Sequence, residues 1–369
     1  MRTSLRYQRP LEGSAMSRHS ARRGPREGGQ ILVLFTLVLV VLILVTGLVV
    51  DGGNAFLNRR DSQNSSDLGA LAGTKRLADY YVNYPNAPLT ASDNVYTAIA
   101  TRMTENGCTT ADNCTWTATY LGPRVGTDFQ ALGPVGASDT AMPGAGGGTE
   151  AMGVRVDATR IASTFFLGVI GQSSWTIKTT AAAESGEPAG APASQILPIA
   201  LVSPPTMDEG NIYSLTSGSN GPGNFGWLSW TGANSAGSLA NSLCTPDNPA
   251  FTLPYQFAGD PGTTNASAVR ACLQQWVKNQ QTVLIPIVLK SNDPNAPVGC
   301  STGAQGNLFN YCVVGLAAFV ITSYSQPAVD QINGRFVKIM PYSTGDSVPG
   351  GLTGPPAANS QFYFLGLTQ

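Results

Sequence analysis

A run of uncharged residues near the N-terminus constrains this chain more than any other feature. From Ile31 to Val50 the sequence reads ILVLFTLVLVVLILVTGLVV, twenty residues in which only two threonines and one glycine are less than strongly apolar. At about 1.5 Å of rise per helical residue, such a run spans about 30 Å, the thickness of the hydrocarbon core of a bilayer. We therefore predict a transmembrane helix over residues 31–50, with the lipid bilayer as its partner.

The charges on either side of this run predict its orientation. Residues 1–30 carry seven arginines and two glutamates, and Asp51 follows the run. Because cytoplasmic flanks are enriched in Lys and Arg, residues 1–30 are expected in the cytoplasm as a basic tail, and residues 51–369 outside the cell membrane. A basic tail also suits nucleic acid, but the adjoining apolar run favours a membrane and no nucleic-acid partner. A cleaved signal peptide is the alternative, although its apolar region is usually about 7–15 residues long and ends at an A-x-A-like site.

All six cysteines follow the predicted span, in the part expected outside the cell membrane. An even number of cysteines in an oxidising compartment predicts three disulfides. Six cysteines allow 15 connectivities, of which sequential pairing closes the shortest loops. A zinc site is the alternative, but the closest spacing is C-x5-C and no C-x2-C occurs. The disulfide candidates are Cys108, Cys114, Cys244, Cys272, Cys300 and Cys312.

The single histidine, His19, lies in the basic tail. The part after the span therefore lacks the imidazole that Ser-His-Asp catalysis, Cys-His catalysis and histidine-based zinc sites need. The adjacent carboxylates Asp208 and Glu209 are interpreted as a solvated turn, and the segment from Asp293 to Asn295 lacks the calcium-binding EF-hand pattern. We predict no enzymatic activity, no catalytic residue, no metal and no cofactor.

Composition favours a turn-rich body after the span. Only 12% of residues are charged, against roughly 25% in an average soluble protein, and 42 glycines and 25 prolines interrupt regular structure. We expect the span to continue into a helical stem and a small α+β unit, together covering residues 51–183. The elements expected there are helices over 51–81, 91–105 and 160–170 and strands over 115–120, 153–157 and 175–183.

A second domain is expected after a linker. Residues 184–194 read ESGEPAGAPAS, the composition of a linker. Residues 195–369 are predicted to form a mainly β domain with one helix over 266–279, whose apolar face includes Trp276. The segment GPGNFG at 221–226 predicts a turn that exposes Phe225. The strand-like runs cover 196–202, 227–230, 283–289, 313–322, 335–339 and 361–365, and the fold class of the whole chain is α+β.

Mostly small side chains line one face of the predicted stem. They recur at three- and four-residue steps and let another backbone approach closely. The face packs either on the chain's own sheet or against neighbouring subunits, and both fit a filament-like assembly. It consists of Ala70, Gly73, Thr74, Leu77, Ala78 and Tyr81.

A dense set of motifs over residues 28–80 resembles the N-terminal Tad domain of the TadE/TadG-like Flp pilus-assembly proteins. The motif positions are Gly28, Gly29, Asp51, Gln63, Asp67, Ala70, Leu71 and Ala72. Later segments resemble the closing part of that domain: GVRV at 153–156, TFFLGVIG at 164–171, WTI at 175–177 and AAA at 181–183. GNFGWL at 223–228 is similar to a feature of the longer TadG-like members.

The resemblance implies a membrane-anchored, non-enzymatic component of Flp pilus assembly whose outer body faces pilin subunits or other assembly proteins. A surface-exposed adhesin is the alternative. Two departures from related patterns matter. Cleavage after Gly28 or Gly29 places Val33 or Leu34 where processed pilins carry Glu, and no D-x-S-x-S motif of a metal-dependent adhesion site occurs. Processing as a pilin is therefore not expected, and the oligomeric state stays open.

Overall fold

The computed structural model describes residues 28–83, 88–126, 128–144, 148–191, 196–202, 210–217, 224–230, 232, 235–245, 248–259, 266–289, 297, 300, 303–305, 308–341, 351–356 and 362–368. The basic tail with His19, the Asp208–Glu209 pair and the Asp293–Asn295 segment lie outside the described residues. The chain divides into two units. The first runs to Gly53 and takes in Thr164–Ser173, and the second holds Asn54–Ser163 and Ser174–Gln369.

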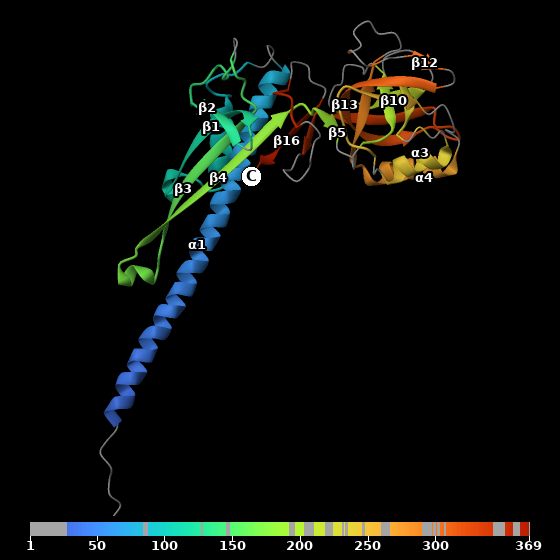
Figure 1. Cartoon of the computed structure of the whole chain (residues 1–369). Helices are drawn as coiled ribbons and strands as arrows, with labels where there is room; N and C mark the ends of the chain where they lie inside the picture. The colour runs from blue at the N-terminus through green and yellow to red at the C-terminus, as the bar shows by residue number, and fades with distance from the viewer. Residues whose placement is uncertain are drawn as a thin grey trace, which may run out of the picture. The chain divides into compact units, whose positions relative to one another are not determined.

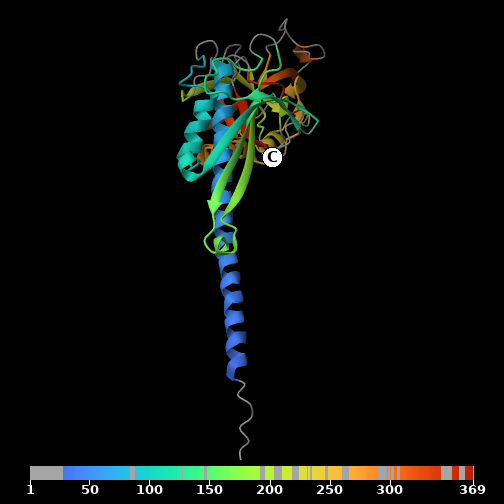
Figure 2. The same cartoon turned by 90° about the vertical axis from the view of Figure 1, so that its left-hand side faces the viewer.

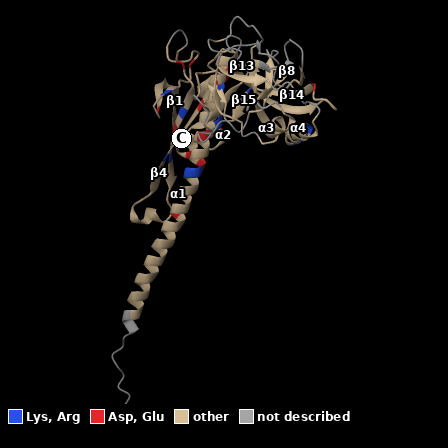
Figure 3. Cartoon of the chain, turned by 45° about the vertical axis from the view of Figure 1, so that its right-hand side comes forward, with Lys and Arg blue, Asp and Glu red and all other residues tan. Residues whose placement is uncertain are grey.

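Helix α1, Gly28–Asn83, contains the predicted span and runs beyond it without interruption (Figure 1). From Ile31 to Val50 every residue except Gly47 is exposed, and this stretch carries no charged side chain (Figure 3). No polar face accompanies these exposed apolar residues, which is typical of a helix surrounded by lipid. The helix is long and apolar enough to cross a membrane, as the sequence predicts.

In the second unit, a six-stranded sheet packs against the part of α1 that follows Gly53. Its strand order is β15-β16-β4-β3-β1-β2. The strands are β1 (Cys114–Val125), β2 (Asp128–Pro134), β3 (Gly153–Ser163), β4 (Ser174–Gly186), β15 (Ile339–Pro341) and β16 (Tyr363–Thr368). Helix α2, Val95–Glu105, packs against α1 and the sheet, with Val95, Ile99 and Met103 fully buried. Its N-terminus is capped by Asn94, whose side chain accepts a hydrogen bond from the Thr97 N–H.

Strands β3 and β4 form a long hairpin, visible beside α1 in Figure 2. The predicted helix over 160–170 is wrong, because β3 continues to Ser163 and only Leu167–Ile170 form a single 3-10 turn, η2. Ile161 and Ala162 extend the in–out alternation of β3 and pair with Thr176 and Trp175 of β4. This cross-strand pairing supplies the backbone hydrogen bonds that a helix would otherwise provide.

The C-terminal part of the second unit is mainly β, as predicted, and it contains an eight-stranded sheet. Its path is β10-β13-β11-β6-β8-β7-β14, with β12 paired to β13. The strands are β6 (Ile199–Val202), β7 (Tyr213–Ser217), β8 (Asn224–Ser229), β10 (Tyr255–Gly259), β11 (Thr282–Val288), β12 (Gly303–Gln305), β13 (Leu308–Tyr324) and β14 (Gln331–Val337). Two helices pack against it, the predicted α4 (Ser267–Asn279) and α3 (Ala236–Cys244), which the sequence did not reveal. The α+β fold class is confirmed.

Two aromatic residues of this part test the sequence interpretation. Trp276 packs against the core and donates a hydrogen bond from its indole nitrogen to the Leu243 carbonyl at 2.7 Å. The predicted exposure of Phe225 is wrong, since only 3% of the residue is exposed. It lies in β8 opposite Leu201, on the same face as Trp227, so the alternation of the two aromatic residues outweighs the turn signal of the neighbouring glycines.

The C-terminal strand β16 pairs antiparallel with β4, so the end of the chain returns to the sheet of the stem. Strand β4 runs to Gly186, and Gly190–Ala191 form the short strand β5 that pairs with β9 (Phe251–Thr252). The first residues of the expected linker are thus part of regular structure. The division into domains at 184–194 stays a prediction. The structure places β16, which follows the expected second domain's other strands in sequence, in the sheet of the stem.

Candidate functional site

Asp51, the first charged residue after the apolar run, binds three backbone N–H groups of the β3–β4 loop. One carboxylate oxygen, Oδ1, accepts from Phe165 at 2.8 Å, and the other, Oδ2, accepts from Phe166 at 3.0 Å and Leu167 at 2.7 Å. Asp51 is completely buried. A charged acceptor with several backbone donors makes strong hydrogen bonds, so Asp51 holds the loop against α1.

The surroundings of Asp51 favour its charged form. Burial raises the pKa of this carboxyl, and the hydrogen bonds from the N–H groups of Leu167, Phe165 and Phe166 lower it by more, so the pKa lies below its ordinary value. Asp51 therefore remains a carboxylate at neutral pH.

Gly47, one helical turn before Asp51, provides the second contact to the loop. A Cβ atom built at this position would collide with the Cβ and Cγ atoms of Phe166. Only glycine allows the Phe166 side chain to lie directly on the helix backbone here. Gly47 and Asp51 thus fix the β3–β4 loop at two points along α1.

A cluster of buried hydroxyl groups joins α1 to the middle of β4. The Thr179 hydroxyl lies 3.1 Å from the Ser62 hydroxyl and 2.9 Å from the Ser66 hydroxyl. Ser62, Ser66 and Thr179 are buried, so these groups have exchanged water for one another. Ser62 and Ser66 are four residues apart and share one helix face, which is the only sequence signal for this cluster.

Gln63 and Asp67 lie next to the hydroxyl cluster. The Gln63 side-chain amide donates to Asp67 Oδ1 at 2.8 Å and to the Thr180 carbonyl at 3.1 Å. Asp67 therefore orients Gln63, and Gln63 in turn holds the backbone of β4.

Thr74 makes the last polar contact along the helix. Its hydroxyl donates to the Ala183 carbonyl of β4 and accepts from the Val154 N–H of β3, both at 3.1 Å. Val154 and Ala183 are cross-strand partners. Thr74 therefore bridges the two strands where the helix crosses the hairpin.

The small residues of α1 pack within the chain. Ala70 is fully buried in the core between α1, α2 and the sheet. Cβ atoms at Gly69 and Gly73 would come within 2.8 Å of Met103 and 2.7 Å of Ile99, which are core residues of α2. The small-residue face thus packs against the chain's own α2 and sheet, one of the two alternatives left open by the sequence.

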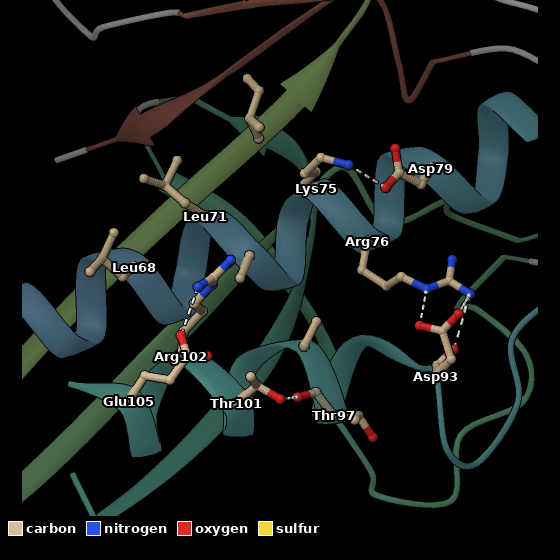
Figure 4. A pocket seen from close by; sticks show the side chains of 13 residues that line it. Leu68, Leu71, Lys75, Arg76, Asp79, Asp93, Thr97, Thr101, Arg102 and Glu105 are labelled. Atoms are coloured by element: carbon tan, nitrogen blue, oxygen red, sulfur yellow. Dashed lines mark hydrogen bonds and ion pairs between the residues drawn. The ribbon is translucent and has the colours of Figure 1, made fainter. Parts of the chain in front are cut away.

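Leu71 and Ala72 are half-buried and line a groove of about 620 Å³ between α1 and α2, shown in Figure 4. Leu68 of α1 and Leu365 of β16 add to its apolar lining. Its charged side chains are paired: Lys75 with Asp79, Arg76 with Asp93, and Arg102 with Glu105. The groove thus has an apolar lining and a rim of ion pairs, the arrangement of apolar core and polar rim that protein interfaces show.

The remaining predicted positions lie apart from these contacts. Gly28 and Gly29 form the first residues of α1. The disulfides join Cys108 to Cys114, Cys244 to Cys272 and Cys300 to Cys312, which is the sequential pairing that closes the shortest loops. Within the described part of the chain, no group of His, Cys, Asp and Glu residues is arranged to hold a metal ion.

A further ion pair ties the expected linker to the sheet. Glu184, in β4, is buried and binds the guanidinium of Arg124 in β1, with the closest N–O distance 2.9 Å. The Arg124 guanidinium also lies over the Phe129 ring, 4.2 Å from its centroid. Sequence reasoning missed this contact because the partner of Glu184 lies 60 residues away.

Comparison with known proteins identifies one family. Residues 29–79 match the family model Tad, described as putative Flp pilus-assembly TadE/G-like. No curated protein and no solved structure matches the chain. The matched segment contains Asp51, Gln63, Asp67 and Ala70, the residues that bind the helix to the hairpin and α2. Over residues 29–79, therefore, the chain is similar to the Tad family, as its N-terminal motifs predict.

Proposed function

We propose that this chain is a membrane-anchored, non-enzymatic component of Flp pilus assembly. Its apolar helix anchors it in the cell membrane with residues 1–30 in the cytoplasm. The stem presents the body outside the cell membrane to pilin subunits or other proteins of the assembly machine. This role requires binding and positioning, and no catalytic step.

The observation that carries the proposal is the continuity of α1 from the apolar run through the Tad segment into the buried contacts with β3, β4 and α2. Ser62, Gln63 and Thr74 bind three successive positions of the hairpin. Buried polar contacts and close packing make the helix rigid over this stretch, from Ser62 to Thr74. Such a stem supports an anchored scaffold better than a mobile tether.

A deletion tests the role of the outer body in assembly. Because β15 and β16 complete the stem sheet, residues 192–338 are removed and the chain from Ile339 onward is retained. A Gly/Ser linker of about eight residues spans about 16 Å as a flexible coil, enough to cross two strand spacings of about 4.8 Å. Membrane fractionation first establishes that the shortened chain is present at the level of the full-length chain.

The expected result is loss of surface pili while the shortened chain remains in the membrane. If pili still assemble but cells no longer attach, the outer body is an adhesin and its proposed role in assembly is wrong. If both pili and attachment persist, the body has neither role.

Labelling of introduced cysteines tests the orientation. Val125 is 72% exposed in the body, and Ser14 lies in the basic tail. In spheroplasts, a membrane-impermeant maleimide is expected to label V125C directly and S14C only after permeabilisation. The reverse pattern would contradict the orientation.

A further inference from the structure

The loop at the tip of the β3–β4 hairpin exposes apolar side chains. It covers Thr164–Ser173, reads TFFLGVIGQS and contains no charged residue. The exposed fraction is 66% for Phe165, 86% for Val169 and 63% for Ile170. Exposed apolar side chains that cluster in one loop mark a contact surface rather than scattered surface residues.

The contacts with α1 place this loop at the end of the apolar run. Asp51 binds its backbone, and the Phe166 side chain lies on Gly47, four residues earlier in the helix. Four helical residues rise about 6 Å. The loop therefore extends about that far along α1 from Asp51 toward the middle of the apolar run. Interfacial segments bury their apolar face to a similar depth, about 5–10 Å into the headgroup and acyl boundary.

Many backbone N–H groups of the loop have a hydrogen-bond partner within the protein. Asp51 accepts from the N–H groups of Phe165, Phe166 and Leu167. Within the loop, further N–H groups donate to carbonyls: Thr164 to Ser173, Val169 to Phe166, Gly171 to Gly168 and Gln172 to Leu167. Backbone groups that enter lipid must be paired in this way, because the hydrocarbon offers no partners.

We propose that the Thr164–Ser173 loop inserts into the bilayer interface beside α1, with lipid as its partner. The apolar surface of the loop continues the exposed apolar surface of α1 at the level where the helix leaves the membrane. The chain then contacts the bilayer at two points, the span and the loop. A helix alone leaves rotation about its own axis free, whereas a second contact fixes the direction in which the stem faces.

Depth measurements on the full-length chain test this proposal. A nitroxide label is attached to V169C in nanodiscs that contain one chain each, without reduction of the native disulfides. Collision rates with oxygen, which concentrates in lipid, and with a nickel chelate, which stays in water, give the depth of the label. The matched controls are V125C, an exposed valine of the body, and V49C, an exposed valine of the span.

The oxygen-to-nickel collision ratio is expected to be several-fold higher at position 169 than at position 125 and to approach that at position 49. A ratio at 169 equal to that at 125 would place the loop in water and overturn the proposal. Low collision rates with both reagents would show a protein-covered loop and also overturn it. A water-like ratio at position 49 would instead remove the membrane span itself, a failure of the proposed function.

A second label at F165C protects the test against a local effect of one substitution. Phe165 precedes η2, Val169 lies within it, and both side chains are exposed. Lipid-like ratios at both positions support insertion of the loop. A lipid-like ratio at 169 with a water-like ratio at 165 would contradict insertion of the loop as a whole.

Discussion

The Asp51 carboxylate accepts a hydrogen bond from the Leu167 N–H at 2.7 Å across 116 residues of sequence. This contact joins α1 to the tip of the β3–β4 hairpin at the point where the apolar run ends. It gives the Tad-like aspartate a structural role, because the same carboxylate also binds Phe165 and Phe166. The residue that follows the predicted span is therefore the residue that positions the loop.

Replacement of Asp51 is expected to loosen this loop. D51N keeps the size of the side chain but removes one of the two acceptor oxygens and the charge. Amide hydrogen exchange of a peptide covering 164–173 is expected to become faster, while a peptide from α2 stays unchanged as the internal control. Unchanged exchange in the loop would show that Asp51 does not hold it.

The Asp51 contact also predicts a dependence on pH. The pKa of Asp51 is lower in the folded chain than in the unfolded chain. Its contribution is therefore fully present above the ordinary aspartate pKa of about 3.9 and is lost as the pH falls through the lower, folded pKa. A mobility probe at V169C is expected to report an immobile loop at neutral pH and a more mobile loop only in strong acid.

The matched control for this titration is the same probe in the D51N chain. Its loop mobility is expected to be higher throughout and to show no transition of its own near the Asp51 pKa. An identical acid transition in both chains would assign the effect to another group.

The buried hydroxyl cluster gives a prediction about stability. T179V keeps the shape of the side chain but removes the hydroxyl that contacts both Ser62 and Ser66; the Ser66 hydroxyl keeps its bond to the Ser62 carbonyl, whereas the Ser62 hydroxyl loses its partner. A buried polar group that loses its partner costs about 1–3 kcal/mol. The free energy of unfolding in detergent, from denaturant titration, is expected to fall by about that amount.

T176V is the control for the cluster, because Thr176 lies on the same strand and is exposed. It is expected to leave the free energy of unfolding within about 0.5 kcal/mol of the original chain. Equal losses from T179V and T176V would show that the cluster contributes nothing specific.

The sequence predicted the elements whose signals are local. The apolar run gave the first part of α1, alternation gave the first half of β3, and runs rich in Val, Ile, Phe and Tyr gave most strands of the larger sheet. The partners of Asp51 and Glu184 were hidden because both contacts join residues far apart in the chain, at points set by how α1 and the sheets pack. The β16 pairing with β4 was hidden for the same reason, since strand pattern shows that a strand exists but not which strand it joins.

The tip loop was misread for a different physical reason. Residues 160–170 combine apolar and small side chains that suit a helix. Nothing in this segment indicates that Asp51, far earlier in the chain, accepts hydrogen bonds from its backbone. Tertiary contacts thus overrode local preference at the segment that we propose to touch the membrane.

The two kinds of glycine in α1 give the last prediction. A Cβ at Gly73 would come within 2.7 Å of Ile99, whereas nothing lies within 4 Å of a Cβ at Gly53. G73L is expected to push α2 away from α1 and to destabilise the fold by about 1–3 kcal/mol, the usual cost of overpacking a core. G53L replaces a glycine in the helix interior without a collision and is expected to be neutral or to stabilise the fold by up to about 1 kcal/mol.

Denaturant titration of the two chains side by side separates the effects, because both gain the same side chain in the same helix. A G73L chain as stable as the G53L chain would show that α2 does not pack closely on the stem at Gly73.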